Sequence, residues 1–231
     1  MQPDPSLILF DVNETLSDTS SLSARFAEVG VPAELAQPWF AVLLRDGFAL
    51  AAAGGSRPFA EVGADALRSV LHSAGTGTGT GTGTDTDLDR AAEHVLGAFG
   101  RFPLHDDVAP GLRALRRGGR RLATLTNGSR AVSEQLLTAA GVREEFEALL
   151  SVEDAATWKP GPAAYRHALR SCGVEAADVL LVAVHPWDLH GAAAAGLATA
   201  WIDRNGAPYP RTLTAPTVRA TSLVDLAEQL A

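Results

Sequence analysis

The sequence predicts an α/β protein in which a parallel sheet is interrupted, directly after its first strand, by a helical insertion. Three observations predict this fold. The short apolar run from Leu7 to Phe10 ends at Asp11, as is typical of a strand buried on both faces of a parallel sheet. Residues 17–103 show mainly helical periodicity. From residue 104 onward apolar runs alternate with helical patterns, which is typical of strands joined by right-handed crossovers.

The insertion contains four segments in which apolar residues recur at helical spacing. We expect Ser17 or Asp18 to cap the first, because both residue types satisfy free backbone N–H groups at a helix start. The four segments are residues 17–30, 32–50, 59–71 and 88–99. A Gly-Thr repeat at residues 75–84 has no large apolar side chain to bury and a high cost of ordering. We predict a flexible surface loop there.

The rest of the chain alternates between short apolar runs and helical patterns separated by glycine and proline. The expected strands after the first are residues 121–126, 148–152, 179–184, 198–202 and 218–221. The expected helices are residues 110–118, 129–140, 160–172, 188–195 and 223–230. We therefore predict two domains, an α/β core made of residues 1–16 and 104–231 and a helical domain made of residues 17–103.

Composition and charge exclude several classes of protein. The 231 residues are 46% hydrophobic and 20% charged, as in soluble globular proteins, and the net charge of −8 argues against a nucleic-acid partner. No apolar run approaches the roughly 18 residues of a membrane span, and the N-terminus lacks the pattern of a signal peptide. The single cysteine, Cys172, excludes an internal disulfide and a cysteine-rich zinc site, and is compatible with the cytoplasm, where we expect the protein. A small anionic substrate and a homodimer both stay open.

Polar clusters follow four of the predicted strands at or just beyond their carboxyl ends. Each cluster alone is a weak signal, because a strand-end aspartate or a Thr-Asn-Gly segment is commonly only a turn. Loops at the carboxyl edge of an open α/β sheet converge on one crevice, so we expect the four clusters to form one site. The clusters are Asp11 to Thr15, Thr126-Asn127, Lys159, and His185 to Asp188.

The order of these clusters resembles the haloacid dehalogenase superfamily. In that family a strand-end aspartate is the nucleophile, a serine or threonine follows the second strand, a lysine precedes a later helix, and acidic residues follow the fourth strand. The helical insertion is similar to the family's cap. The resemblance implies a Rossmann-like core with a helical cap inserted after the first strand.

The superfamily contains Mg²⁺-dependent phosphatases as well as metal-independent dehalogenases. The phosphatases use a second aspartate, two residues after the nucleophile, as acid and base. Here that position is Asn13, which cannot transfer a proton in this way. The phosphatases also carry acidic residues where this chain has Ala183 and Val184, and Mg²⁺ requires hard oxygen ligands. We therefore expect neither a metal nor another cofactor.

The chain resembles the L-2-haloacid dehalogenases more closely. Their opening segment is similar to residues 10–18, their Ser-Asn-Gly to residues 126–128, their Lys-Pro…Tyr segment to residues 158–165, and their final segment to residues 187–204. Arg45 occupies the place of their halide-binding arginine, although it could equally lie at a helix edge with its charge in water. This chain departs from their pattern at three places. Asn13 stands where they have an aromatic residue, Glu14 where they have a glycine, and residues 183–185 where they have a Ser-Ser-Asn run.

The resemblance implies hydrolytic dehalogenation of a short 2-haloalkanoic acid. Asp11, kept ionised by Lys159, would displace halide and form an ester, with Arg45 contacting the halide. Water, positioned by Asp188, Lys159 and His185, would then cleave the ester; a structural role for His185 is the alternative. The residues expected at the substrate are Thr15, Thr126, Asn127, Tyr165 and Trp187. Tyr165 could instead support Lys159, and Trp187 could instead pack near the site. Two further hypotheses stay open, a Mg²⁺-dependent phosphatase of a small phosphoester and a non-catalytic protein that binds an anion.

Overall fold

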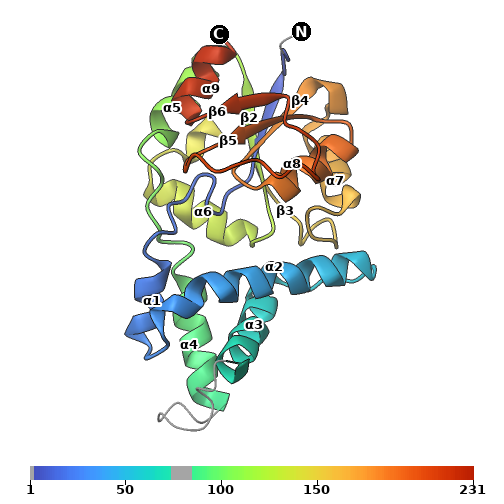
Figure 1. Ribbon diagram of the computed structural model, residues 1–231. Coiled ribbons are helices and arrows are strands. Elements are labelled where there is room, and N and C mark those ends of the chain that lie inside the picture. Colours follow the sequence, from blue (N-terminus) through green and yellow to red (C-terminus); the bar gives the residue numbers. More distant parts are fainter. Residues whose placement is uncertain (1–2, 74–84) are drawn as a thin grey trace.

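A six-stranded parallel sheet forms the centre of the protein (Figure 1). The computed structural model describes residues 3–73 and 85–231, so the predicted loop at 75–84 lies outside the described residues. The strand order is β3-β2-β1-β4-β5-β6. The strands are β1 (Leu7–Phe10), β2 (Arg121–Thr126), β3 (Ala148–Ser151), β4 (Val179–Ala183), β5 (Ala198–Ile202) and β6 (Val218–Ala220). Parallel pairing and all six strand positions confirm the predicted fold class.

Strand β1 lies in the middle of the sheet, and its position determines where the site forms. Phe10 pairs with Thr124 of β2 on one side and with Val182 of β4 on the other. All four β1 residues are at most 1% exposed, as expected for a strand covered on both faces. The chain runs from β1 outward to β3 and then returns to β4, so the strand order reverses beside β1. Ligands of open α/β sheets bind at this type of switch point.

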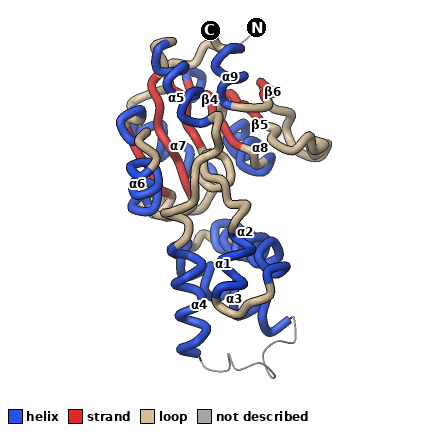
Figure 2. Tube along the Cα trace, turned by 90° about the vertical axis from the view of Figure 1, so that its left-hand side faces the viewer, coloured by secondary structure: helices blue, strands red, loops and turns tan. Residues whose placement is uncertain are grey.

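Helices cover both faces of the sheet (Figures 1 and 2). Ser129 caps α6, since its Oγ accepts a hydrogen bond from the backbone N–H of Val132 (3.2 Å). Helix α7 has a proline at its start and ends at Gly173, whose φ of 63° favours glycine. These helices are α5 (Val108–Arg117), α6 (Arg130–Ala139), α7 (Pro162–Cys172), α8 (Pro186–Ala194) and α9 (Leu223–Gln229).

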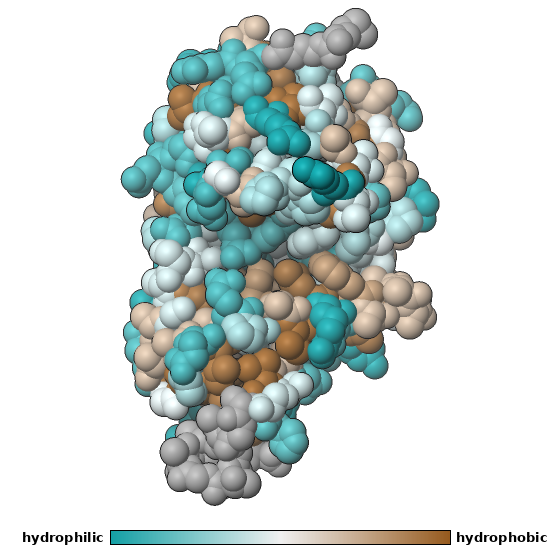
Figure 3. Space-filling view, viewed as in Figure 1, coloured by the Kyte–Doolittle hydropathy of each residue, from teal (hydrophilic) through white to brown (hydrophobic). Residues whose placement is uncertain are grey.

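The insertion forms a separate group of helices next to the carboxyl ends of the strands, and α2 runs along the side that faces the sheet (Figure 1). Its interior is aromatic: Trp39 is fully buried and donates a hydrogen bond to the carbonyl of Gly63 (2.8 Å). In the view of Figure 3, hydrophobic residues gather over this group of helices, whereas the core above it is more hydrophilic. The helices are α1 (Leu22–Glu28), α2 (Ala36–Ala52), α3 (Phe59–Ser73) and α4 (Asp85–Gly97).

The predicted start of the first cap helix is wrong. Ser17 is buried in an antiparallel bridge with Leu104, and the Asp18 carboxylate accepts a hydrogen bond from the N–H of Ser20 (2.9 Å). Neither residue caps a helix, because both belong to the segment that leads from the core into the cap. This segment runs beside the one that leads back from the cap into the core. The division into two domains at these crossings stays a prediction. In the described part of the chain, no helix has the length and apolar character needed to cross a membrane.

Candidate active site

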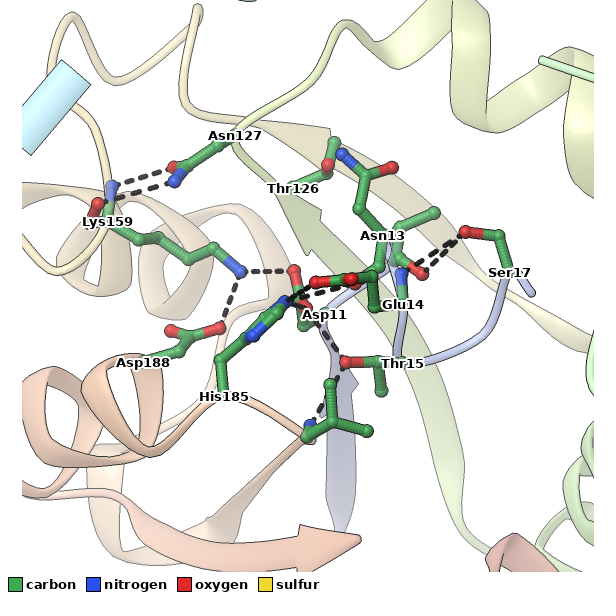
Figure 4. Close-up of polar contacts among 12 residues, drawn as sticks. Asp11, Asn13, Glu14, Thr15, Ser17, Thr126, Asn127, Lys159, His185 and Asp188 are labelled. Carbon is green, nitrogen blue, oxygen red and sulfur yellow. Dashed lines mark hydrogen bonds and ion pairs between the residues drawn. The ribbon is translucent and has the colours of Figure 1, made fainter. Parts of the chain in front are cut away.

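Asp11 lies at the carboxyl end of β1 (Figure 4). Its N–H donates to the carbonyl of Val182 (3.0 Å), which continues the ladder between β1 and β4 by one residue. The side chain is 5% exposed, and both carboxylate oxygens accept hydrogen bonds. Oδ1 accepts from Lys159 Nζ (2.8 Å) and Oδ2 from Thr15 Oγ1 (2.8 Å). The sheet therefore fixes the position of the carboxylate and the two donors fix its orientation.

Lys159 is fully buried, and its ammonium group has three partners. Nζ donates to Asp11 (2.8 Å), to Asp188 Oδ2 (2.6 Å) and to the carbonyl of Leu125 (2.8 Å). A buried charge is tolerated only when it is paired in this way. The Asn127 amide holds the lysine backbone on both sides, since Oδ1 accepts from the Lys159 N–H (2.9 Å) and Nδ2 donates to the Lys159 carbonyl (3.3 Å). Asn127 thus positions Lys159.

Asp188 lies in the first turn of α8 and is fully buried. Tyr165 Oη is 2.7 Å from its Oδ1 and donates to it. The two helices can approach closely because residue 191 is glycine; a Cβ there would lie 2.7 Å from Tyr165 Oη and 2.6 Å from the Pro160 Cβ. Burial and the charge of Asp188 raise the pKa of Tyr165 well above its ordinary value, so the phenol stays a donor.

The two predicted threonines have different surroundings. Thr15 Oγ1 accepts from the N–H of Val184 (3.2 Å) and donates to Asp11, so its hydroxyl links β1 to β4. Thr126 Oγ1 accepts from the N–H of Gly128 (3.0 Å) within a turn. Thr126 also lines a cavity of about 70 Å³ between core and cap, together with Asn13. Thr15 therefore belongs to the Asp11 cluster, and Thr126 borders it.

His185 lies beside Asp11, next to the carboxylate oxygen that does not bind Lys159 (Figure 4). Its Nε2 is 3.6 Å from Asp11 Oδ2, 3.4 Å from Glu14 Oε2 and 3.3 Å from the carbonyl of Asn13. The imidazole stacks on the indole of Trp187 with ring centres 5.1 Å apart. The structure thus brings His185 and Trp187 to the predicted site, and adds Glu14.

The geometry agrees with comparisons to known proteins. A model of the haloacid dehalogenase-like hydrolases matches residues 5–196. The chain belongs to this family. Haloacetate dehalogenase H-2 of Moraxella sp. (strain B) is 42% identical over 100 residues, which are 43% of this chain and 45% of that protein. The (S)-2-haloacid dehalogenase of Pseudomonas sp. (strain YL) is 33% identical over 134 residues, 58% of each chain.

The chain spans about half the length of these two curated relatives. The structural likeness extends further. A solved L-2-haloacid dehalogenase structure is 29% identical, has a TM-score of 0.84, and covers 100% of this chain and 99% of its own. The resemblance inferred from the sequence is therefore confirmed at the level of family and fold.

In this haloacid dehalogenase-like hydrolase, two carboxylates share Lys159 and their pKa values move in opposite directions. Burial raises the pKa of Asp11, but the charges of Lys159 and His185 and the hydrogen bonds outweigh it, so the pKa lies below its ordinary value. Burial raises the pKa of Asp188, and despite Lys159 the nearby Asp11 charge adds to that effect. Carboxyl groups whose pKa values are separated in this way can have different roles, and the lowered value keeps Asp11 ionised as a nucleophile must be.

The donor set of this site does not fit a metal ion. The oxygens of Asp11 and Asp188 already accept hydrogen bonds from Lys159, Thr15 and Tyr165. Lys159 Nζ lies between the two carboxylates, where a divalent cation would need the same oxygens. Among the described residues, no group of three His, Cys, Asp or Glu side chains could hold a metal.

Arg45 lies on the exposed edge of α2. Its side chain is 65% exposed, and its Nε donates to the neighbouring Asp46 (2.8 Å). Other residues of α2 face the site instead: Phe48 packs on Trp187, with ring centres 4.8 Å apart. The structure thus places Arg45 as a helix-edge residue, and its halide-binding role stays a prediction.

Sequence reasoning left the role of Glu14 open and did not find the carbonyl of Leu125. The carbonyl has no sequence signal, because every residue carries one. Glu14 had a signal, since it stands where the resemblance leads us to expect glycine. Its φ of 61° explains that expectation, because this backbone conformation favours glycine.

Proposed function

We propose that this protein hydrolyses the carbon–halogen bond of short 2-haloalkanoic acids through an ester formed on Asp11. One observation carries the proposal. Asp11 is buried at the switch point of the sheet, and Lys159 lowers its pKa, so it is an ionised and weakly hydrated nucleophile. The names of the relatives, haloacetate and 2-haloacid dehalogenases, support the same class of substrate.

In the first step an Asp11 oxygen attacks C2 of the substrate, the carbon–halogen bond breaks, and halide leaves. Within the described part of the chain, each Asp11 oxygen accepts a single side-chain hydrogen bond, so an electron pair remains for attack. Thr15, Asn127 and Tyr165 act in this proposal by holding Asp11, Lys159 and Asp188. Thr126 and Trp187 remain the proposed substrate contacts, because each borders the cluster without being bonded to it.

In the second step water attacks the carbonyl carbon of the Asp11 ester, and the hydroxy acid leaves. We assign the positioning of that water to Asp188, Lys159 and His185. The Lys159 ammonium, preorganised by three hydrogen bonds, stabilises the negative charge that develops on the ester oxygen. Asp188 keeps the ammonium in place when Asp11 is esterified and neutral.

A single turnover in ¹⁸O-water, with enzyme in excess, tests the ester. Because water attacks the protein carbonyl, the product should be unlabelled and Asp11 should gain the label. Asp11→Asn should release no halide, since a neutral amide is a far poorer nucleophile. Label in the product of the first turnover would mean that water attacks the substrate directly and would refute the ester.

We further propose that the reaction needs no metal. The apolar Ala183 and Val184, together with the cation that Lys159 supplies, support this proposal. Halide release should survive EDTA. Loss of activity in EDTA that added Mg²⁺ restores, or phosphate release from a small phosphoester with Mg²⁺, would favour a phosphatase instead.

A further inference from the structure

Glu14 has no part in the steps above. Its carboxylate nevertheless lies close to the side chain of His185, which itself lies beside Asp11. Glu14 Oε2 is 3.4 Å from His185 Nε2, and the same nitrogen is 3.6 Å from Asp11 Oδ2. One ring nitrogen thus lies between the carboxylate of the nucleophile and a second carboxylate (Figure 4).

Contacts on three sides hold Glu14 in this place. Its N–H donates to Ser17 Oγ (3.3 Å), its carbonyl lies 3.1 Å from His105 Nε2, and Thr19 Oγ1 donates to Oε1 (3.5 Å). Oε2 is the carboxylate oxygen left to face His185. Glu14 is therefore a positioned group, although its backbone adopts a φ that disfavours residues with a side chain.

Exposure increases along this line of side chains. Asp11 is 5% exposed, His185 14% and Glu14 27%. His185 and Glu14 line an open cavity of about 410 Å³ that Asp11 does not reach. The three groups therefore connect the buried nucleophile with the surface.

The proposed reaction requires such a connection. Hydrolysis of the ester consumes one water. Its oxygen stays on Asp11, one proton leaves on the product hydroxyl group, and the second proton must leave the site because Asp11 ends the cycle ionised. Lys159 cannot take that proton, since its ammonium already carries three, and Asp188 beyond it is fully buried.

We propose that His185 and Glu14 form the proton exit of the active site, an inference that rests on the proposed function. His185 first gives its Nε2 proton to Glu14 and keeps the proton on Nδ1. The freed electron pair of Nε2 accepts a proton from the water that attacks the Asp11 ester. This returns the ring to its starting state, and Glu14 releases the proton that it received to water in the cavity, so that one proton leaves in each turnover. Glu14 orients His185 and accepts its proton without contacting the substrate.

Two variants of Glu14 test this exit. Glu14→Gln keeps the size of the side chain and removes the acid, and Glu14→Gly removes the side chain at a φ that glycine favours, so that folding is preserved. Halide release in a single turnover, which reports ester formation, should be unchanged. Ester hydrolysis in weak buffer should slow about a hundredfold, the low end of what a positioned proton-transfer group contributes. Added imidazole should restore it, by accepting the proton from solution.

The matched control is Asp203→Asn, which removes a carboxylate from the same cavity and retains the Oδ1 atom that accepts from the Ala207 N–H (3.1 Å). It should hydrolyse the ester at the wild-type rate with no response to imidazole. Wild-type hydrolysis rates in both Glu14 variants, or slow rates that imidazole does not raise, overturn the proton exit while the ester mechanism stands. Absence of halide release from the wild type with every haloacid overturns the proposed function, and the inference with it.

Discussion

The core side and the cap side of the candidate site differ in how firmly their polar groups are held. On the core side Asp11, Lys159 and Asp188 are at most 5% exposed and bonded to one another. On the cap side Arg45, the predicted halide ligand, is 65% exposed and bonded to its neighbour Asp46. The core holds its polar groups at strand ends, where the hydrogen bonds of the sheet fix the backbone. At a helix edge, a long side chain can instead extend its charged group into water.

The cap instead meets the core through packing close to the lysine. Trp158, which precedes Lys159, is fully buried, stacks on Phe59 at 5.8 Å, and donates from Nε1 to the carbonyl of Arg57 (2.8 Å). Its ring also fills the space above Gly47 of α2. The cap therefore contributes shape to the site, and the core contributes charge.

Removing the charge of Lys159 should have the largest effect on both activity and stability. Lys159→Met leaves two buried carboxylates facing each other, which should abolish halide release and lower the free energy of unfolding by about 3–5 kcal/mol. Denaturant titration measures the stability. Arg25→Met is the control; it removes the exposed ion pair with Glu28 and should leave the stability nearly unchanged. An equal loss of stability in the two variants would show that the hydrogen bonds of the buried Lys159 contribute no more than an exposed ion pair.

The pH dependence tests the hydrogen bonds that hold Asp11. Its lowered pKa means that ionisation favours folding above the ordinary value of 3.8, and that this stability is lost as pH falls through the folded pKa. Halide release by the wild type should therefore persist below pH 3.8 as long as the fold does. Thr15→Val removes the donor to Oδ2, so the acid limb of its rate profile should move to higher pH.

Thr15→Ser, which keeps the hydroxyl group, is the control and should retain the wild-type profile. Ionisation of Asp188 affects the stability of the fold in the opposite direction. Its raised pKa means that this ionisation opposes folding as pH rises through the folded value. A profile for Thr15→Val that coincides with the wild type would mean that Lys159 alone sets the ionisation of Asp11.

A methyl group on α2 tests the packing between cap and core. A Cβ at residue 47 would lie 2.2 Å from Trp158 Cε3, so Gly47→Ala should cost about 1–3 kcal/mol through overpacking and should slow halide release by displacing the segment before Lys159. Gly97→Ala, where the nearest atom is 3.8 Å away, should instead gain up to about 1 kcal/mol. Full activity in Gly47→Ala would show that the cap position does not affect Lys159.

The smallest effect is expected on the cap side. Arg45→Ala removes only an exposed ion pair, which contributes little, so kcat/KM should fall by less than about fivefold. Steady-state halide release over several haloacids measures this. A loss of several orders of magnitude would mean that Arg45 turns inward when substrate binds, and would support the halide-binding role.

Local sequence patterns were sufficient for the strands and for most of the core side of the site. The apolar run before Asp11 can be buried only in a central strand, and the carboxyl ends of parallel strands must meet, so Asp11, Lys159 and Asp188 could be grouped from their order alone. The start of the first cap helix could not be predicted in this way. Ser17 has the composition of a cap, but its place in a bridge to Leu104 depends on a partner 87 positions away.

The sequence by itself determined the parallel sheet, the helical insertion and the family, because these follow from periodicity and from residue types at strand ends. Only the tertiary structure decided which side chains meet at distances that permit chemistry. Arg45 lies exposed to solvent, because the local sequence does not specify which way a side chain at a helix edge points. Glu14 reaches His185 through a left-handed backbone conformation that composition does not reveal. Contacts across 171 positions of the chain depend on how the strands pack, and that information is not contained in any single segment.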